Sequence, residues 1–240
     1  MPEFTLVLPY YRQPEMLRKQ LDNAQSLPEG VTVVIVDDGS PEPAEDVFTD
    51  TDRAELYRIQ EDIPWNREQA RNIGGYVCRT EWLVHTDLDH VLTLEAAEKL
   101  LQFNADPNLW YRFPRWRIGR ADSTRKKDQI HHLKKHGQIH PHIDSYLITR
   151  KRFMSSPYDE RYSGCLGGGS PFLARMARVY GDAHVLPEDI YLNVHTSHDI
   201  PDSSITTLSR DTAEYSRRRK AIGENDKPPK MLLHDWCKVR

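Results

Sequence analysis

One apolar run constrains the fold of this chain more than any other feature. Residues 31–36 (V-T-V-V-I-V) are β-branched throughout and lead directly into Asp37-Asp38-Gly39-Ser40. A continuous run of this kind is typical of a parallel strand that is covered on both faces of its sheet. The sequence therefore predicts an α/β fold in which a buried strand ends in two carboxylates.

Strands and helices are predicted to alternate through residue 103. The expected elements are strands at 4–9, 31–36, 56–60 and 82–86 and helices at 14–26, 66–79 and 94–103. Asn66 is placed to cap the second of these helices. Alternation of this kind indicates a sheet whose ligands lie beyond the carboxyl ends of its strands.

A second pair of acids follows the strand expected at 82–86. Asp87 and Asp89 in H-T-D-L-D-H are separated by one residue, so in an extended chain they point to the same side. Two such carboxylates repel each other unless a cation lies between them, and Mg²⁺ or Mn²⁺ commonly shares oxygen ligands with phosphates. The pattern indicates a metal–diphosphate site, and a solvated loop is the alternative.

Composition narrows the function classes. The chain has 240 residues, of which 38% are hydrophobic, and its mean hydropathy is -0.71. No apolar run approaches the roughly 20 residues of a membrane span. Three widely spaced cysteines fit neither a disulfide framework nor a tetrahedral zinc site. With no secretory pattern at the N-terminus, we expect a cytoplasmic protein without a membrane anchor.

Taken together, the motifs resemble those of the family-2 nucleotide-sugar glycosyltransferases with the GT-A fold. The motifs that carry the resemblance are F-T-L-V-L-P-Y-Y-R-Q-P, V-I-V-D-D-G-S, N-R-E-Q-A-R-N-I-G and H-T-D-L-D-H, in that order, followed by an H-x-x-H at His195 and His198. The resemblance covers residues 4–90 closely and 158–198 more loosely. It implies a Rossmann-like mixed sheet flanked by helices, in a single domain with a basic acceptor lobe.

The resemblance also implies a domain organisation and an activity. The domain would cover residues 1–200, with a nucleotide-sugar half at 1–103, an acceptor half at 104–200 and a charged extension at 201–240. The activity would be metal-dependent transfer of a sugar from a nucleotide diphosphate, with a UDP-sugar favoured, to a hydroxyl. The alternatives are a nucleotidyltransferase, whose glycine-rich signature near the first strand is absent, and a nucleic-acid-binding module, which leaves the acids unexplained.

For the donor, the resemblance implies specific contacts. Asp38 would accept a hydrogen bond from a uracil-like ring N–H and Asp37 would meet the ribose, with the division of these two roles left open. The other implied contacts are Pro9, Tyr10, Tyr11, Arg12, Gly39, Arg67, Arg71, Asn72, Gly74, Asp87 and Leu88. Taken singly, Tyr10 and Tyr11 fit packing aromatics equally well, and Arg71 fits a solvated helix arginine.

For the metal, the resemblance implies two main ligands. Asp89 would bind Mn²⁺ or Mg²⁺ directly, and His195 would be the third protein ligand. Asp87 and His198 are the less favoured ligands, since Asp87 in relatives more often contacts the ribose or reaches the metal through water. The cation would neutralise charge on the departing diphosphate.

The pattern departs from the family in one loop. Relatives carry adjacent Glu-Asp there, and one of these carboxylates deprotonates the acceptor hydroxyl, whereas this chain has Gly168 and Gly169. Glycine cannot act as a base, so another acid has taken the role, or the enzyme retains anomeric configuration, or the protein binds without turnover. The substitute acids considered are Asp159, Glu160 and Asp144, of which we assign Asp159 and Glu160, with Asp89, to catalysis.

The acceptor half contains a strongly basic segment. Residues 110–152 hold 12 Lys and Arg against 3 Asp and Glu, a net charge of +9. Such a run is either a solvated face or a surface for a polyanion, and basic residues with aromatics suit nucleic acid. We expect a polyanionic acceptor such as modified DNA, with a polysaccharide, a cell-wall polymer or a protein as rivals. The residues assigned to it are Trp116, Arg125, Lys126, Lys127, Gly168 and Gly169.

Overall fold

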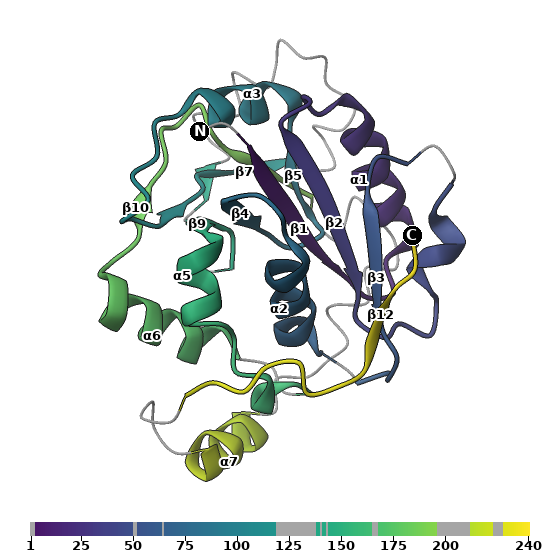
Figure 1. The fold of residues 1–240 in the computed structure, drawn as a ribbon, viewed down its shortest axis with the longest axis vertical. Coiled ribbons are helices and arrows are strands. Elements are labelled where there is room, and N and C mark those ends of the chain that lie inside the picture. The colour runs from purple at the N-terminus through teal and green to yellow at the C-terminus, as the bar shows by residue number, and fades with distance from the viewer. Residues whose placement is uncertain are drawn as a thin grey trace.

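The computed structural model is a mixed α/β fold built around one large sheet (Figure 1). It describes residues 3–49, 52–63, 65–118, 138–139, 141–142, 144–164, 168–195, 212–222 and 228–240. The strands of the main sheet are β1 (Phe4–Tyr10), β2 (Val31–Asp37), β3 (Glu55–Ile59), β4 (Trp82–His85), β6 (Tyr111–Arg112), β9 (Tyr146–Thr149), β10 (His184–Val185) and β12 (Trp236–Lys238). Their order across the sheet is β10-β6-β9-β4-β1-β2-β3-β12.

The central strands are parallel, which brings their carboxyl ends to one edge. β1 pairs in parallel with both β2 and β4, and β2 pairs in parallel with β3. In this register Tyr10 lies opposite Asp37, and Val7 lies opposite His85. The acids that follow β2 and β4 therefore leave the sheet on the same side. The strands and helices predicted through residue 103 are present, and the predicted fold class is confirmed.

Helices cover both faces of the sheet, because successive side chains of a strand alternate between its faces. The helices are α1 (Pro14–Ser26), α2 (Arg67–Val77), α3 (Leu94–Gln102), α5 (Arg150–Ser155), α6 (Gly169–Tyr180) and α7 (Thr212–Ile222). Leu8 and Ile35 belong to the apolar cluster that contains the buried side chains of α1 and α3. Val36, on the opposite face, packs with Ala70 and Ile73 of α2. The continuous apolar run at 31–36 is explained by this double coverage.

A smaller sheet brings the late histidine segment to the D-x-D. Its strands are β5 (His90–Leu92), β7 (Arg115–Ile118), β8 (Gln138–Ile139) and β11 (Leu192–His195), in the order β5-β11-β7-β8. β11 runs antiparallel to β5, and the backbone N–H of His195 donates to the backbone oxygen of Asp89 at 2.9 Å. His195 thus lies directly beside Asp89, more than 100 residues away in the sequence.

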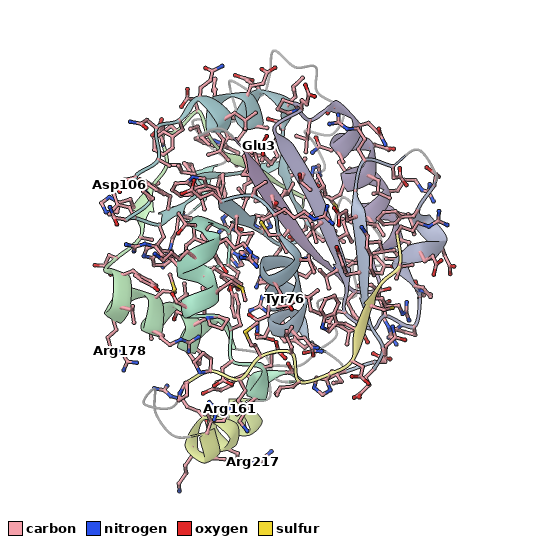
Figure 2. The ribbon with its side chains drawn as sticks, in the orientation of Figure 1. Glu3, Tyr76, Asp106, Arg161, Arg178 and Arg217 are labelled. Carbon is pink, nitrogen blue, oxygen red and sulfur yellow. The ribbon has the colours of Figure 1, made fainter. Side chains whose placement is uncertain are left out.

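The C-terminal segment returns to the main sheet. β12 pairs antiparallel with β3, and Figure 1 shows this segment running along the outer edge, with α7 apart from the sheet. Arg161, in the short 3-10 helix η3 (Glu160–Tyr162), lies close to this segment (Figure 2), and its Nη2 donates to the backbone oxygen of Pro228. The division at residue 200 remains a prediction. Within the described residues, no helix has the length and apolar character of a membrane span.

The prediction that the Asn66 side chain caps α2 is wrong. Asn66 does occupy the N-cap position, but its side chain accepts no helix N–H. Its amide nitrogen instead donates to Oε1 of Gln69 at 3.1 Å, while its own backbone N–H donates to Asp38. The start of the helix is therefore tied to the acid after β2, which the capping pattern could not reveal.

Candidate active site

Asp37, the last residue of β2, is held by three donors. Its Oδ1 accepts from the backbone N–H of Ser40, and its Oδ2 accepts from the backbone N–H of Ala44 and from Nη1 of Arg58, all at 2.8 Å. Ala44 begins the short 3-10 helix η1 (Ala44–Val47). Asp37 therefore fixes the turn that follows β2, and both of its oxygens are engaged within the protein.

Asp38, the second acid, is buried but only half satisfied. Its Oδ2 accepts from the backbone N–H of Asn66 at 2.9 Å, whereas its Oδ1 has no hydrogen-bond partner among the described residues. Burial, and then the negative charge of Glu68, raise the pKa of Asp38 well above its usual range. A ligand N–H directed at Oδ1 would supply the missing donor and favour the ionised form.

Gly39 is required by the turn that carries these acids. Its φ is +70°, and a Cβ at this position would lie 2.0 Å from the backbone oxygen of Glu61. Only glycine meets both conditions, since other residues are strained at this φ and have no space here. The D-D-G-S motif thus builds a tight turn that leaves Asp38 under the start of α2.

Asp87, Asp89 and His90 form a compact group after β4. One potential ligand atom from each lies within 4.8 Å of the others. Nδ1 of His90 is 2.7 Å from Oδ1 of Asp89, and Nη1 of Arg115 is 2.9 Å from Nε2 of His90. Because arginine can only donate, Nε2 of a neutral His90 accepts, and Nδ1 carries the proton given to Asp89. His90 thus orients Asp89, whose side chain is 33% exposed and within reach of a ligand.

A buried arginine connects this group to a third carboxylate. Arg71, which is fully buried, pairs with Asp87 through Nη2, and its Nη1 lies 3.5 Å from Oδ1 of Asp144. Burial alone would raise the pKa of Asp87, but the charges of Arg71, His142 and Arg67 hold this pKa well below its usual range. Asp87 is therefore anionic at neutral pH, and the sequence alternative of a solvated helix arginine does not apply to Arg71.

A comparison of sequence families identifies the chain's relatives. The family "Glycosyl transferase family 2" matches residues 5–177, which is most of the chain. The chain belongs to glycosyl transferase family 2. The predicted family is confirmed, and with it the enzyme class, glycosyltransferase. The comparison with curated proteins gave no match.

Solved structures of low sequence identity share the fold of this family-2 member. A mannosyltransferase from Pyrobaculum calidifontis, solved with GDP-Man and Mn²⁺, is 17% identical over 95% of this chain, with a TM-score of 0.57. TarS from S. aureus is 13% identical over 90%, with a TM-score of 0.60. Glucosyl-3-phosphoglycerate synthase from Mycobacterium tuberculosis, solved with phosphoglyceric acid, is 15% identical over 81%, with a TM-score of 0.53. The chain spans 66%, 68% and 71% of these proteins, or about two thirds of their length.

Aromatic residues expected near the base differ in exposure. Tyr10 is fully buried in the core and its hydroxyl donates to the backbone oxygen of Glu42 at 2.9 Å. Tyr11 is partly exposed, donates to Oδ1 of Asp62 at 3.0 Å, and has the guanidinium of Arg12 5.3 Å from its ring centre. Tyr10 therefore fits the packing alternative, whereas the stacking of Tyr11 on a base stays a prediction.

Three further predicted contacts lie in or near the core. Pro9 is half-buried in β1, and Leu88 belongs to the main apolar cluster. Trp116, assigned to the acceptor, is buried and packs edge-on against Tyr191. These positions shape the site through packing, and their assignment to ligand contact remains a prediction.

Asn72 and Gly74, expected beside the sugar, hold α2 to its neighbours. Nδ2 of Asn72 donates to the backbone oxygen of Tyr158 at 2.9 Å and to Oε1 of Glu160 at 2.7 Å, and its Oδ1 accepts from the backbone N–H of Tyr158. A Cβ at Gly74 would lie 2.2 Å from Cγ1 of Val7. Asn72 therefore positions the 158–160 segment, and Gly74 allows α2 to pack closely on β1.

The two acids assigned as substitutes for the catalytic base are strongly engaged. Asp159 makes two hydrogen bonds to the guanidinium of Arg161, at 2.8 and 2.5 Å. Glu160 accepts backbone N–H bonds from Leu232 at 2.7 Å and from Leu233 at 2.8 Å. These hydrogen bonds hold the two carboxylates to η3 and to the C-terminal segment. Their assignment to catalysis stays a prediction.

Glu68 and His142 belong to the site but were missed in the sequence. Glu68 is fully buried at the start of α2, and Nδ1 of His142 lies 3.4 Å from Oδ2 of Asp87. An acid in the first turn of a helix is ordinarily predicted to face solvent, and His142 lies in a basic segment without hydrophobic periodicity. No local sequence pattern therefore pointed to a site role for either residue. His198, Arg125, Lys126 and Lys127 lie outside the described residues.

Proposed function

We propose that this chain transfers a sugar from a nucleotide diphosphate, bound with a divalent cation, to an acceptor hydroxyl. The observation that carries the proposal is the group of Asp87, Asp89 and His90 at the carboxyl end of β4, on the same edge as Asp38. Arg71 adds a buried positive charge next to Asp87. Carboxylates for a cation, an arginine and an acid with an open acceptor oxygen together suit a nucleoside diphosphate.

The donor we propose is a UDP-sugar. Oδ1 of Asp38 lacks a donor, and the N3–H of uracil is of the required kind. Guanine also carries a ring N–H, so a GDP-sugar is the competing donor, and the mannosyltransferase neighbour was solved with GDP-Man. Cytosine and adenine lack a ring N–H at neutral pH and offer only an exocyclic amino group, so we expect them to pair less well with Asp38, at a cost of about 1–3 kcal/mol.

The cation we propose is Mn²⁺ or Mg²⁺. Asp87 and Asp89 supply the hard oxygen ligands that both ions prefer, and the partial exposure of Asp89 leaves it accessible, so the residues present fit such an ion. Asp89 is the better direct ligand, because Asp87 is already paired with Arg71. His195 is proposed as the third ligand through Nε2, since its backbone is bonded to that of Asp89 and its Nδ1 lies 3.2 Å from Nζ of Lys19. The bound ion would neutralise charge on the leaving diphosphate.

Calorimetry with UDP, GDP and CDP in the presence of Mn²⁺ tests the donor. We expect UDP to bind with a Kd at least about tenfold below that of CDP, because CDP leaves Oδ1 of Asp38 without its donor. Asp38→Ala should reduce this preference to about threefold or less, while the exposed Asp46→Ala serves as the matched control. Equal binding of all three nucleotides, or no binding, would contradict the proposal.

The acceptor we propose is a polyanion, with DNA as the testable example. The support is the net charge of +9 in residues 110–152. Affinity should fall linearly in a log–log plot against salt, with a slope of about -0.9 for each neutralised phosphate of duplex DNA. The variant Arg125→Glu, Lys126→Glu, Lys127→Glu should flatten the slope by up to about three. The absence of a shifted DNA band at moderate salt would exclude DNA as the acceptor and leave the other polyanions and proteins as candidates.

A further inference from the structure

Glu68 is the least satisfied of the buried acids in the described part of the chain. Its side chain has no exposed surface, and neither carboxylate oxygen has a hydrogen-bond partner among the other residues that the structure describes. The nearest cation, Nε of Arg67, lies 3.6 Å from Oε1, beyond hydrogen-bond distance. Leaving a buried polar group unpaired is costly, so an acid kept in this state calls for a functional explanation.

Two glycines leave the space in which Glu68 and Asp144 lie. A Cβ at Gly168 would lie 2.3 Å from Oε1 of Glu68, and a Cβ at Gly169 would lie 2.7 Å from Oδ1 of Asp144. Gly168 has φ -56° and ψ -23°, a conformation open to any residue. A side chain at this position would therefore displace the Glu68 carboxylate, whereas the backbone conformation itself does not call for glycine. Gly168 and Gly169, which stand where relatives carry acids, therefore lie against an acid of α2 (Glu68) and an acid of the segment before β9 (Asp144).

The two acids differ in how far they are engaged. Oδ2 of Asp144 pairs with Nη2 of Arg67 at 3.0 Å, and Oδ1 accepts from the hydroxyl of Tyr158 at 3.2 Å. Both carboxylate oxygens of Asp144 are therefore engaged within the protein. Glu68 has only the looser approach of Arg67 at 3.6 Å, so its carboxylate is the one of the two left open to accept a proton.

We propose that Glu68 is the general base that removes the proton from the acceptor hydroxyl, with Asp144 and Arg67 as positioning residues. This inference rests on the proposed function. The acceptor O–H bond breaks as its proton passes to an Oε of Glu68, and the oxygen forms a bond to the anomeric carbon. The bond from that carbon to the diphosphate breaks at the same time, the nucleoside diphosphate leaves with the electron pair, and Glu68 later releases the proton to water. Direct displacement of this kind inverts the anomeric centre.

The surroundings of Glu68 set its working pH. Burial raises its pKa to about 7, opposed by the charge of Arg67, by its own backbone N–H and by the charge of Arg71, and supported by Asp144. Asp38 faces it from the end of β2. Since a base must be ionised to accept a proton, the rate should rise with pH and level off above about 7.

The test uses the whole chain, Mn²⁺ and hydrolysis of UDP-glucose and GDP-mannose, with water as the acceptor probe. Glu68→Gln should lower the rate at least about 100-fold and remove the pH dependence near 7, while nucleotide binding by calorimetry changes less than about threefold. Glu68→Asp should keep part of the rate and its pH dependence. The exposed Glu95→Gln is the matched control.

A swap variant separates chemistry from folding. Glu68→Ala combined with Gly168→Glu returns one carboxylate to the same space, and it should recover at least about tenfold of the rate that Glu68→Ala alone loses. Normal hydrolysis and an unchanged pH profile in Glu68→Gln, or a product of retained configuration, would overturn the inference while leaving the proposed function intact. Absence of nucleotide binding in the unaltered chain would instead overturn both.

Discussion

Glu68 and Glu160 are two buried glutamates with opposite surroundings. Glu160, 2% exposed, accepts hydrogen bonds from Asn72, Leu232 and Leu233, and it ties η3 to the C-terminal segment. Glu68, with no exposed surface, accepts none from any other described residue. Burial raises the pKa of both carboxyls, but in Glu160 those hydrogen bonds oppose the rise. Hydrogen-bond satisfaction, and not burial, distinguishes an acid that supports the fold from one that is available for chemistry.

The two adjacent acids at the end of β2 repeat this contrast at closer range. Asp37 has both oxygens engaged by Ser40, Ala44 and Arg58, whereas Asp38 keeps one oxygen without a donor. We therefore infer that Asp37 maintains the turn and that Asp38 is available to a ligand.

The largest expected effect is on the rate of sugar transfer when Asp89 is replaced. We expect Asp89→Ala to lower sugar transfer by about 100- to 1,000-fold, because a preorganised charge next to the leaving diphosphate is lost. Excess chelator should inhibit the unaltered chain to a similar extent, and the melting temperature should change little, since Asp89 is partly exposed. The measurement is donor turnover with and without Mn²⁺. Full turnover in Asp89→Ala would show that an accessible acid at this edge is not part of the chemistry.

Replacing Asp37 should lower the stability of the fold and leave the preference among nucleotide donors unchanged. Asp37→Asn places an amide N–H₂ against donors that now bond to carboxylate oxygens, so we expect a loss of about 3 kcal/mol in the free energy of unfolding. Urea denaturation followed by circular dichroism measures this loss. The preference for UDP over CDP should persist in the folded variant. A variant of normal stability that has lost this preference would reverse the roles of Asp37 and Asp38.

Glu160 should show a smaller loss of the same kind. Glu160→Gln keeps one acceptor oxygen but sets a donor against a backbone N–H, and we expect a loss of about 2 kcal/mol. The C-terminal segment should become more sensitive to limited proteolysis, because Leu232 and Leu233 lose a shared anchor. If Glu160→Gln instead abolishes turnover at unchanged stability, the sequence assignment of Glu160 to catalysis is supported.

Much of the framework could be predicted from the sequence because its signals are local. The β-branched run at 31–36 and the apolar runs at 4–9 and 82–86 each define a strand without outside information. The ends of these strands then indicate where Asp38 and Asp89 must gather.

The remaining features depend on contacts between distant segments. Glu68 meets Gly168 across 100 residues, and Glu160 finds its donors about 70 residues further along the chain. No local pattern reports such partners, so the sequence did not separate a satisfied acid from an unsatisfied one. For the same reason the prediction of a side-chain cap at Asn66 was wrong, since its place is set by Asp38.

The central claim is tested most directly by the pH dependence of stability in Glu68→Gln. The pKa of Glu68 is about 4.5 in the unfolded chain and about 7 in the folded chain. Its contribution to the free energy of unfolding is therefore fully present below pH 4.5 and is lost as the pH rises through about 7. The free energy of unfolding of Glu68→Gln, relative to the unaltered chain, should therefore increase by roughly 2–3 kcal/mol between pH 5 and pH 8. A difference that is flat or falls over this range would show that the carboxylate is already satisfied, and would contradict the account.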